Sequence, residues 1–330
     1  MKLTRRGTGI IVIGLTAFFL GAIFGARALD AVVVPVIAVL IIAFAQVKMT
    51  DRPEVNRTAL EPGFPGEKRT MRVRLDTDGI VTVIDRLGLG LSPDMVERTV
   101  AGETAVEYEI ELEKRGVHNV GPLSIGIRDS LGLLTAEYRY SGFDPLLVYP
   151  TMREIVSPGP LSGMINTEGE IERQTFDQLR EYMPGDSLRD IHWKTSAKRQ
   201  DNFYVVEYSQ GDEEGVSVVA EATADQSGAS VDAMATATAS VVTYLLDHGA
   251  EVSLAVPNGS IDRGTNDQKR QETLTLLART RPGRVSMENI ESADVYILGE
   301  KGEAIIEVDG QQIQFDQLTG DTSSNSKVLA

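Results

Sequence analysis

The sequence contains no cysteine, only three histidines and a single tryptophan in 330 residues. Without cysteine there are no disulfides, no thiolate nucleophiles and no Cys-based zinc or iron–sulfur sites. Several catalytic signatures are also missing, namely H-E-x-x-H, Gly-x-Ser-x-Gly and a Gly-rich loop with the spacing that cradles phosphates. We therefore expect binding and assembly, and no enzymatic turnover.

Lysine is scarce, with nine residues against twenty-three arginines, and the net charge is −16. The first fifty residues carry +4, so the other 280 carry −20. A soluble part this acidic argues against nucleic-acid binding, which depends on neutralising phosphates with basic side chains. An acidic, Lys-poor surface is typical of a salt-rich cytoplasm, where ions screen self-repulsion, so we expect a halophilic source.

Two apolar runs without charge, residues 7–26 and 31–47, are each long enough to span a bilayer. A cleaved signal peptide is the alternative, with Lys2, Arg5 and Arg6 as its basic region and Ala26-Arg27-Ala28 as its cleavage site. The second apolar run, which follows within five residues, favours a transmembrane hairpin over residues 1–50.

The basic residues around this hairpin predict its orientation. Three precede it and three follow it, whereas only Arg27 lies in the connecting loop. By the positive-inside rule we expect a two-pass protein of the cell membrane, with both termini and the soluble domains in the cytoplasm.

The rest of the chain reads as a multidomain α+β protein. A Pro- and Gly-rich linker covers residues 51–66, and period-2 alternation such as Met71–Leu75 predicts an antiparallel β-sandwich-like domain over 67–150. A second linker covers 151–170. Strands alternate with helices over 171–317, which predicts an α/β domain with a parallel sheet, and a loose tail follows over 318–330.

Residues 180–198 concentrate unlike charges, the single tryptophan and a Pro-Gly turn. Capping residues after the turn predict a helix over about 187–198. One interpretation is an exposed helix with weak ion pairs. The other is a partly buried network around the tryptophan that joins two domains or forms a binding surface. The candidate residues are Arg180, Tyr182, Gly185, Asp186, Arg189, Trp193 and Lys194.

The order Arg180-x-Tyr182-x-Pro184-Gly185-Asp186-x-x-Arg189-x-Ile191-x-Trp193-Lys194-x-x-Ala197 resembles the signature of the family catalogued as domain of unknown function 58. Residues 114–122 resemble a basic-Gly and Gly-Pro segment of that family. Residues 128–133 resemble its Asp-Pro-Phe-Gly-Leu turn, with Ser130 and Leu131 at the Pro and Phe positions. The resemblance covers roughly residues 1–258.

This resemblance implies a non-enzymatic adaptor in a chaperone-like or envelope-associated complex. The implied partners are an AAA ATPase of the MoxR class and a transglutaminase-like membrane protein.

The resemblance further implies a degenerate von Willebrand factor A-like domain at the C-terminal end. Such domains can hold Mg²⁺ through Asp-x-Ser-x-Ser after the first strand. Glu221, Thr223 and Asp225 occupy those positions here and keep none of the three identities, and a second register begins at Asp225-x-Ser227. We prefer a polar loop that caps the following helix, and so expect no cofactor. A divalent-metal-dependent ligand-binding domain is the alternative function.

Overall fold

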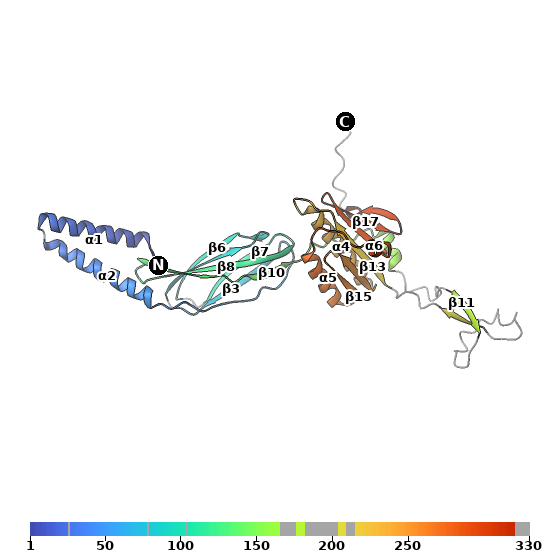
Figure 1. Cartoon of the computed structure of the whole chain (residues 1–330), viewed down its shortest axis with the longest axis horizontal. Helices are drawn as coiled ribbons and strands as arrows, with labels where there is room; N and C mark the ends of the chain where they lie inside the picture. Colours follow the sequence, from blue (N-terminus) through green and yellow to red (C-terminus); the bar gives the residue numbers. More distant parts are fainter. Residues whose placement is uncertain are drawn as a thin grey trace, which may run out of the picture. The chain divides into compact units, whose positions relative to one another are not determined.

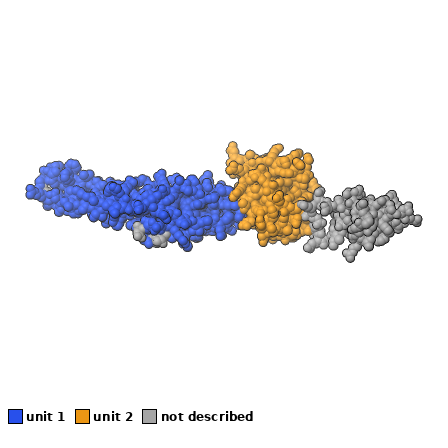
Figure 2. Space-filling view, turned by 60° about the horizontal axis from the view of Figure 1, so that its bottom comes forward, with its two compact units in different colours: residues 1–151 blue, residues 152–330 orange. Residues whose placement is uncertain are grey.

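The computed structural model describes residues 1–25, 27–77, 79–102, 105–165, 176–181, 204–208 and 215–320 (Figure 1). The chain divides into two compact units, Met1–Thr151 and Met152–Ala330 (Figure 2). The backbone of β11 (Phe176–Glu181), which includes Arg180, pairs antiparallel with that of β12 (Tyr204–Tyr208). The predicted helix over 187–198 lies outside the described residues, as do the other signature candidates, Tyr182, Gly185, Asp186, Arg189, Trp193 and Lys194.

Unit 1 begins with two long apolar helices, α1 (Arg5–Phe24) and α2 (Asp30–Met49), joined through the short 3-10 helix η1 (Arg27–Leu29). Gly25 ends α1 in the left-handed conformation at φ 65°, which glycine adopts without steric cost. The helices approach closely at Gly14, where a Cβ would lie 2.8 Å from Cγ1 of Val36. Both helices are long and apolar enough to cross a membrane, so they are consistent with a membrane anchor.

The remainder of unit 1 consists of antiparallel strands in two sheets. The first has the order β1 (Lys2–Leu3), β9 (Leu134–Tyr140), β8 (Gly116–Arg128), β4 (Ile80–Leu87) and β6 (Met95–Ala101), with β10 (Asp144–Val148) also paired to β8. The second has the order β2 (Val55–Arg57), β3 (Lys68–Leu75), β7 (Ala105–Leu112) and β5 (Leu91–Ser92). The predicted linker over 51–66 therefore contains a strand.

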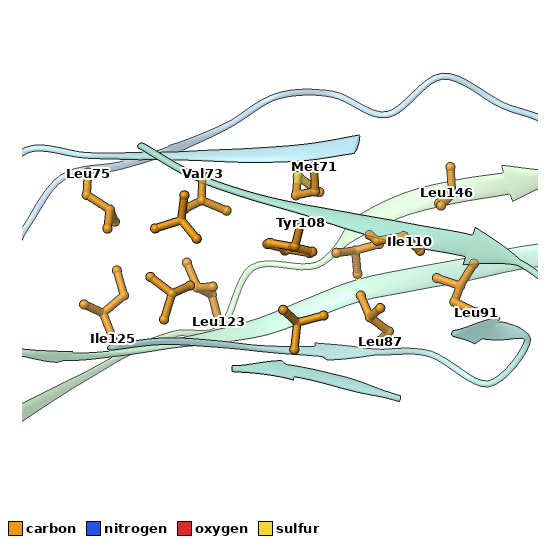
Figure 3. Close-up of a cluster of buried hydrophobic side chains, with 14 of the residues drawn as sticks. Met71, Val73, Leu75, Leu87, Leu91, Tyr108, Ile110, Leu123, Ile125 and Leu146 are labelled. Atoms are coloured by element: carbon orange, nitrogen blue, oxygen red, sulfur yellow. The ribbon is translucent and has the colours of Figure 1, made fainter. Parts of the chain in front are cut away.

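Period-2 alternation places the apolar side chains of these strands in one shared core. Figure 3 shows side chains of β3 and β7 facing those of β4 and β8. The best buried of them, at no more than 1% exposure, include Met71, Val73, Ile110, Leu123 and Ile125. The alternation that predicted antiparallel strands thus sets which face of each strand is apolar.

A buried polar group links the two sheets. Arg57 of β2 forms an ion pair with Asp85 of β4 at 3.0 Å, and the hydroxyl of Tyr108 on β7 donates to the same carboxylate. Asp85 is fully buried, and the desolvation of its carboxylate raises its pKa in spite of these partners. Arg57 also pairs with Asp144 at 2.8 Å. These contacts hold together strands of both sheets.

Unit 2 contains a six-stranded mixed sheet. Its order is β15 (Gly259–Gly264), β14 (Val252–Val256), β13 (Val216–Ala222), β16 (Val295–Glu300), β17 (Glu303–Val308) and β18 (Gln311–Gln314). The expected parallel pairing occurs between β13 and its two neighbours, whereas the outer strands pair antiparallel. Strands β17 and β18 form a hairpin around Asp309-Gly310, a dipeptide typical of such turns.

Helix α4 (Ala229–Asp247) packs against the central strands of this sheet, and α5 (Asp267–Arg279) packs against α4. By length and composition, helix α4 could also cross a membrane, but 67% of its apolar 18-residue segment is buried inside the structure. Two short helices, α6 (Met287–Glu291) and α7 (Phe315–Thr319), complete the described part of this unit together with the 3-10 helix η2 (Gly159–Met164).

Residues assigned from the sequence to the second linker and to the tail contact each other. The backbone amides of Val156 and Ser157 donate to the carbonyl oxygen of Leu318 at 2.9 and 3.0 Å. Leu318 is 2% exposed, and Leu161 of η2 is fully buried. The described parts of both segments therefore belong to the packed structure of unit 2.

Candidate functional site

A cavity of about 760 Å³ runs along one face of β16, from Asp294 before the strand to Glu300 at its end, where it also meets the end of β13. From β13 the chain passes through α4 to β14 on one side, and it later returns through α5 and α6 to β16 on the other side. The connections therefore diverge between β13 and β16. In α/β sheets such a switch point, at the carboxyl ends of parallel strands, is the usual location of a binding site. We take this cavity as the candidate site of unit 2.

The lining of this cavity is predominantly acidic. Among the described lining residues Arg284 is the only cation, against five carboxylate side chains, and apolar side chains such as Met287, Ile290 and Leu298 complete the wall. The five acids are Glu221, Asp294, Glu300, Glu307 and Asp309. Asp294 accepts from the backbone amide of Ser217 at 2.7 Å, and Lys301 lies 3.8 Å from Glu300. The excess negative charge favours a cationic ligand.

Glu221 is a fixed part of the cavity wall. It is 7% exposed, and its two carboxylate oxygens accept from the backbone amide of Val285 and the hydroxyl of Tyr296, both at 2.9 Å. Burial, and then the bond to Glu221, raises the pKa of Tyr296, which keeps the phenol protonated as a donor. The carboxylate thus ties β13 to β16 and to the loop before α6.

Asp225 caps the N-terminal end of α4. Its carboxylate accepts from the backbone amides of Gly228, Ala229 and Ser230, the last at 2.6 Å, and from the hydroxyl of Ser227 at 2.8 Å. Hydrogen bonds from Ser230, and then from Ser227 and Gly228, lower its pKa. This is the helix cap that the polar loop led us to expect.

The three positions considered for Mg²⁺ do not fit a common ion. Glu221 and Asp225 each satisfy donors of the protein, and the hydroxyl of Thr223 donates to the carbonyl oxygen of Gly299 at 3.3 Å. The second register fails for the same reason, since Ser227 donates to Asp225. Over the described residues there is no cluster of three or more His, Asp or Glu side chains suited to a metal. We therefore derive no metal chemistry from this site.

Sequence reasoning placed Glu221 and Thr223 at the end of β13, and both line the cavity. It did not single out Tyr296, Arg284 or Glu300. On β16, Tyr296 lies between the buried residues Val295 and Ile297, so its side chain points to the opposite face of the sheet. A side chain with a polar hydroxyl on that less buried face was the one signal in the sequence that could have identified Tyr296. Its contact with Glu221, 75 positions away, gave no local pattern.

These features describe a chain with two membrane-span-like helices, an antiparallel β part and a mixed α/β unit with an acidic cavity. A family model described as Protein of unknown function DUF58 matches residues 178–289. The match includes the whole signature from Arg180 to Ala197 and continues through β13, α4, β14, β15 and α5 into α6, whereas residues 114–122 and 128–133 lie outside it. It confirms the resemblance that the signature indicated. A search of curated proteins gave no match.

Proposed function

We propose that this chain is a membrane-anchored adaptor that binds a partner protein through unit 2 and performs no catalysis itself. The observation that carries this proposal is the acidic cavity along β16, which lies within unit 2 and is lined partly by family-matched residues such as Glu221 and Arg284 and partly by residues that follow the match. Its charge suits a basic segment of a partner, which would enter with Lys or Arg side chains.

The strand order of unit 2 supports a degenerate A-type domain. The first strand, β13, lies in the centre, the helix α4 follows it directly, and β14 and β16 flank it in parallel. In this proposal the loop after β13 has exchanged a metal-binding role for the helix cap made by Asp225. Partner binding would then depend on protein side chains, and the adaptor would act without Mg²⁺.

The contacts of the hairpin support an orientation in which both of its ends lie on one side of the membrane. Strand β1, just before α1, pairs with β9, and the hydroxyl of Tyr138 on β9 donates to the carbonyl oxygen of Thr50, just after α2, at 2.9 Å. The basic residues at both ends make the cytoplasm the side we propose.

The partner that we propose is an AAA ATPase of the MoxR class, and a transglutaminase-like membrane protein is a further candidate member of the complex. Both come from the family resemblance. A test is to purify the full chain in detergent and high salt and to measure its binding to a purified MoxR-class ATPase by surface plasmon resonance.

Charge removal in the cavity provides the specific comparison. We expect Glu300→Gln combined with Glu307→Gln to weaken ATPase binding severalfold, because each substitution removes a negative charge from the cavity. Asp262→Asn, which neutralises an exposed carboxylate on β15 at the edge of the sheet and does not line the cavity, should leave binding unchanged. Equal affinity of all three proteins would exclude the cavity as the contact, and no binding by any of them would refute the MoxR proposal.

A separate substitution, Trp193→Ala, tests the signature. If the folded variant keeps wild-type affinity, the signature is not the ATPase contact.

A further inference from the structure

The turn between β8 and β9, residues Asp129 to Leu134, is held between the two ends of the apolar hairpin. The backbone amide and the hydroxyl of Thr4, the N-cap of α1, donate to the carbonyl oxygens of Leu133 and Gly132 at 2.9 and 2.6 Å. The backbone amide of Ser130 donates to Oε1 of Gln46 in α2 at 3.3 Å. One turn of the β part therefore contacts both helices directly.

These contacts set the depth of the turn relative to α1. Gly7 is buried beneath it, and a Cβ at Gly7 would overlap the carbonyl oxygen of Leu133. The turn therefore lies beside the first helical turn of α1. A helix of 20 residues is about 30 Å long, which is about the thickness of the hydrocarbon core, so α1 needs its whole length to cross. The turn must then lie at the membrane surface itself.

The backbone of the turn is suited to a medium poor in water. All six of its N–H groups have a protein acceptor. The carboxylate of Asp129 accepts from the amides of Leu131, Leu133 and Leu134 at 2.6 to 3.0 Å, and Asp129 is only 3% exposed. The amides of Asp129 and Gly132 donate to carbonyl oxygens within the turn. Irregular backbone enters a membrane only when its polar groups are satisfied by the protein, and here the donors are.

The two leucines of the turn differ in exposure. Leu133 is 1% exposed, whereas Leu131 is 53% exposed. Basic side chains on the adjoining helix ends, Arg5, Arg6 and Lys48, lie at the same level of the hairpin. An exposed apolar side chain beside basic ones is the combination that binds an anionic bilayer surface.

We propose that the turn Asp129–Leu134 is an interfacial element that places Leu131 among the headgroups and upper acyl chains of anionic phospholipids. The proposal rests on the membrane anchoring by α1 and α2 proposed above. Its consequence is that the β part contacts the lipid surface directly, and is held against the bilayer at a fixed height.

Because the chain has no cysteine, single cysteines can be labelled at chosen positions. We would introduce Leu131→Cys, Leu89→Cys and Phe19→Cys separately into the full chain and label each with the fluorophore NBD. Leu89 is 90% exposed and follows the far end of β4, since Leu87 pairs with Val120 whereas Ile80 pairs with Arg128 next to the turn. Phe19 is a 59% exposed residue within α1. The labelled proteins are reconstituted into vesicles that contain phosphatidylglycerol and a lipid with a nitroxide near the headgroup or deep in the acyl chain.

We expect the label at Leu131 to be quenched by the shallow nitroxide, the label at Phe19 by the deep one, and the label at Leu89 by neither. If Phe19 is quenched while Leu131 behaves like Leu89, the interfacial proposal is overturned and the anchor stands. If the label at Phe19 is quenched by neither lipid, the anchor itself fails, and the interfacial proposal fails with it. In mixed vesicles, a nitroxide carried by phosphatidylglycerol should quench the label at Leu131 more than the same nitroxide carried by phosphatidylcholine at equal content, and equal quenching would overturn the preference for anionic lipids.

Discussion

At the scale of single residues, Arg57 pairs with two carboxylates in different surroundings. The side chain of Asp85 is fully buried, and that of Asp144 is 53% exposed. Asp85→Ala removes the buried partner of Arg57 and the acceptor of the Tyr108 hydroxyl, so we expect it to lower the free energy of unfolding by about 3 kcal/mol. Asp144→Ala removes a solvent-screened partner of the same arginine and should cost less than about 1 kcal/mol.

Thermal unfolding of the full chain in detergent micelles, followed by circular dichroism, measures both variants. A comparable loss in the two would mean that Asp85 contributes no more than a surface ion pair does. A third variant, Tyr108→Phe, removes only the hydroxyl that donates to Asp85. Its loss of unfolding free energy should lie between those of Asp85→Ala and Asp144→Ala, because a buried acceptor without a donor costs about 1–3 kcal/mol.

The contribution of Asp225 to stability should depend on pH. Its hydrogen bonds to the start of α4 lower its pKa, so its stabilising contribution is present above the pKa of an aspartate in the unfolded chain. That contribution is lost as the pH falls through the lowered pKa of the folded state. We expect Asp225→Asn to melt below wild type at neutral pH, and the difference to shrink as the pH falls below the usual range of aspartate.

The control for this pH series is Asp262→Asn, which neutralises an exposed carboxylate on β15 of the same unit. The difference in melting temperature between Asp262→Asn and wild type should stay small at every pH of the series. A difference between Asp225→Asn and wild type that does not change with pH would show that the charge of Asp225 has no role in the cap.

At the scale of elements, α1 and the turn Asp129–Leu134 pack closely because residue 7 is a glycine and has no Cβ. We expect Gly7→Val to separate the turn from the helix and to destabilise unit 1 by about 1–3 kcal/mol, as overpacking does. Gly9→Val makes the same change two residues along α1, where nothing lies within 4 Å of the added Cβ. Thermal unfolding in micelles and trypsin cleavage at Arg128, the last residue of β8, would distinguish them, and equal behaviour of the two variants would contradict the close contact.

Elements with a strong periodic pattern could be predicted from the sequence. Strands β13 and β14, with helix α4 between them, follow the alternation of strands and helices predicted over residues 171–317. Strand β6 has no alternation from which it could be predicted, because it is an edge strand and only Val96 of its seven residues is buried. In strand β8, Gly121-Pro122 interrupts the apolar pattern.

The candidate site was less predictable, for reasons of distance along the chain. The carboxylate of Glu221 was placed correctly at the end of a strand, but its donors, Val285 and Tyr296, come from segments more than sixty residues later. The turn at Asp129 was noticed as a family-like motif, yet its contacts with Thr4 and Gln46 connect parts of the sequence that have no common pattern. The sequence therefore identifies Glu221 and Asp129 as candidate residues, whereas their hydrogen-bond partners are known only from the tertiary structure.

At the scale of the whole molecule, the net charge of −16 predicts a dependence on salt. Repulsion among acidic side chains destabilises the compact state, and ions screen it. We expect the circular dichroism signal of folded protein to be lost when salt is lowered below molar concentrations, and to return on its addition. A melting temperature that is the same at low and molar salt would remove the halophilic interpretation.

The pairing of Lys2–Leu3 with Leu134 and Thr135 has a consequence for biosynthesis. The ribosome makes β1 and both apolar helices long before β9 emerges. Under the proposed anchoring, the hairpin enters the bilayer before β1 can pair with β9, and this pairing forms only after translation has passed residue 140. A ribosome-stalled chain that ends before β9 should already be membrane-integrated with its first residues exposed to protease, and the same residues should become protected once β9 has been translated.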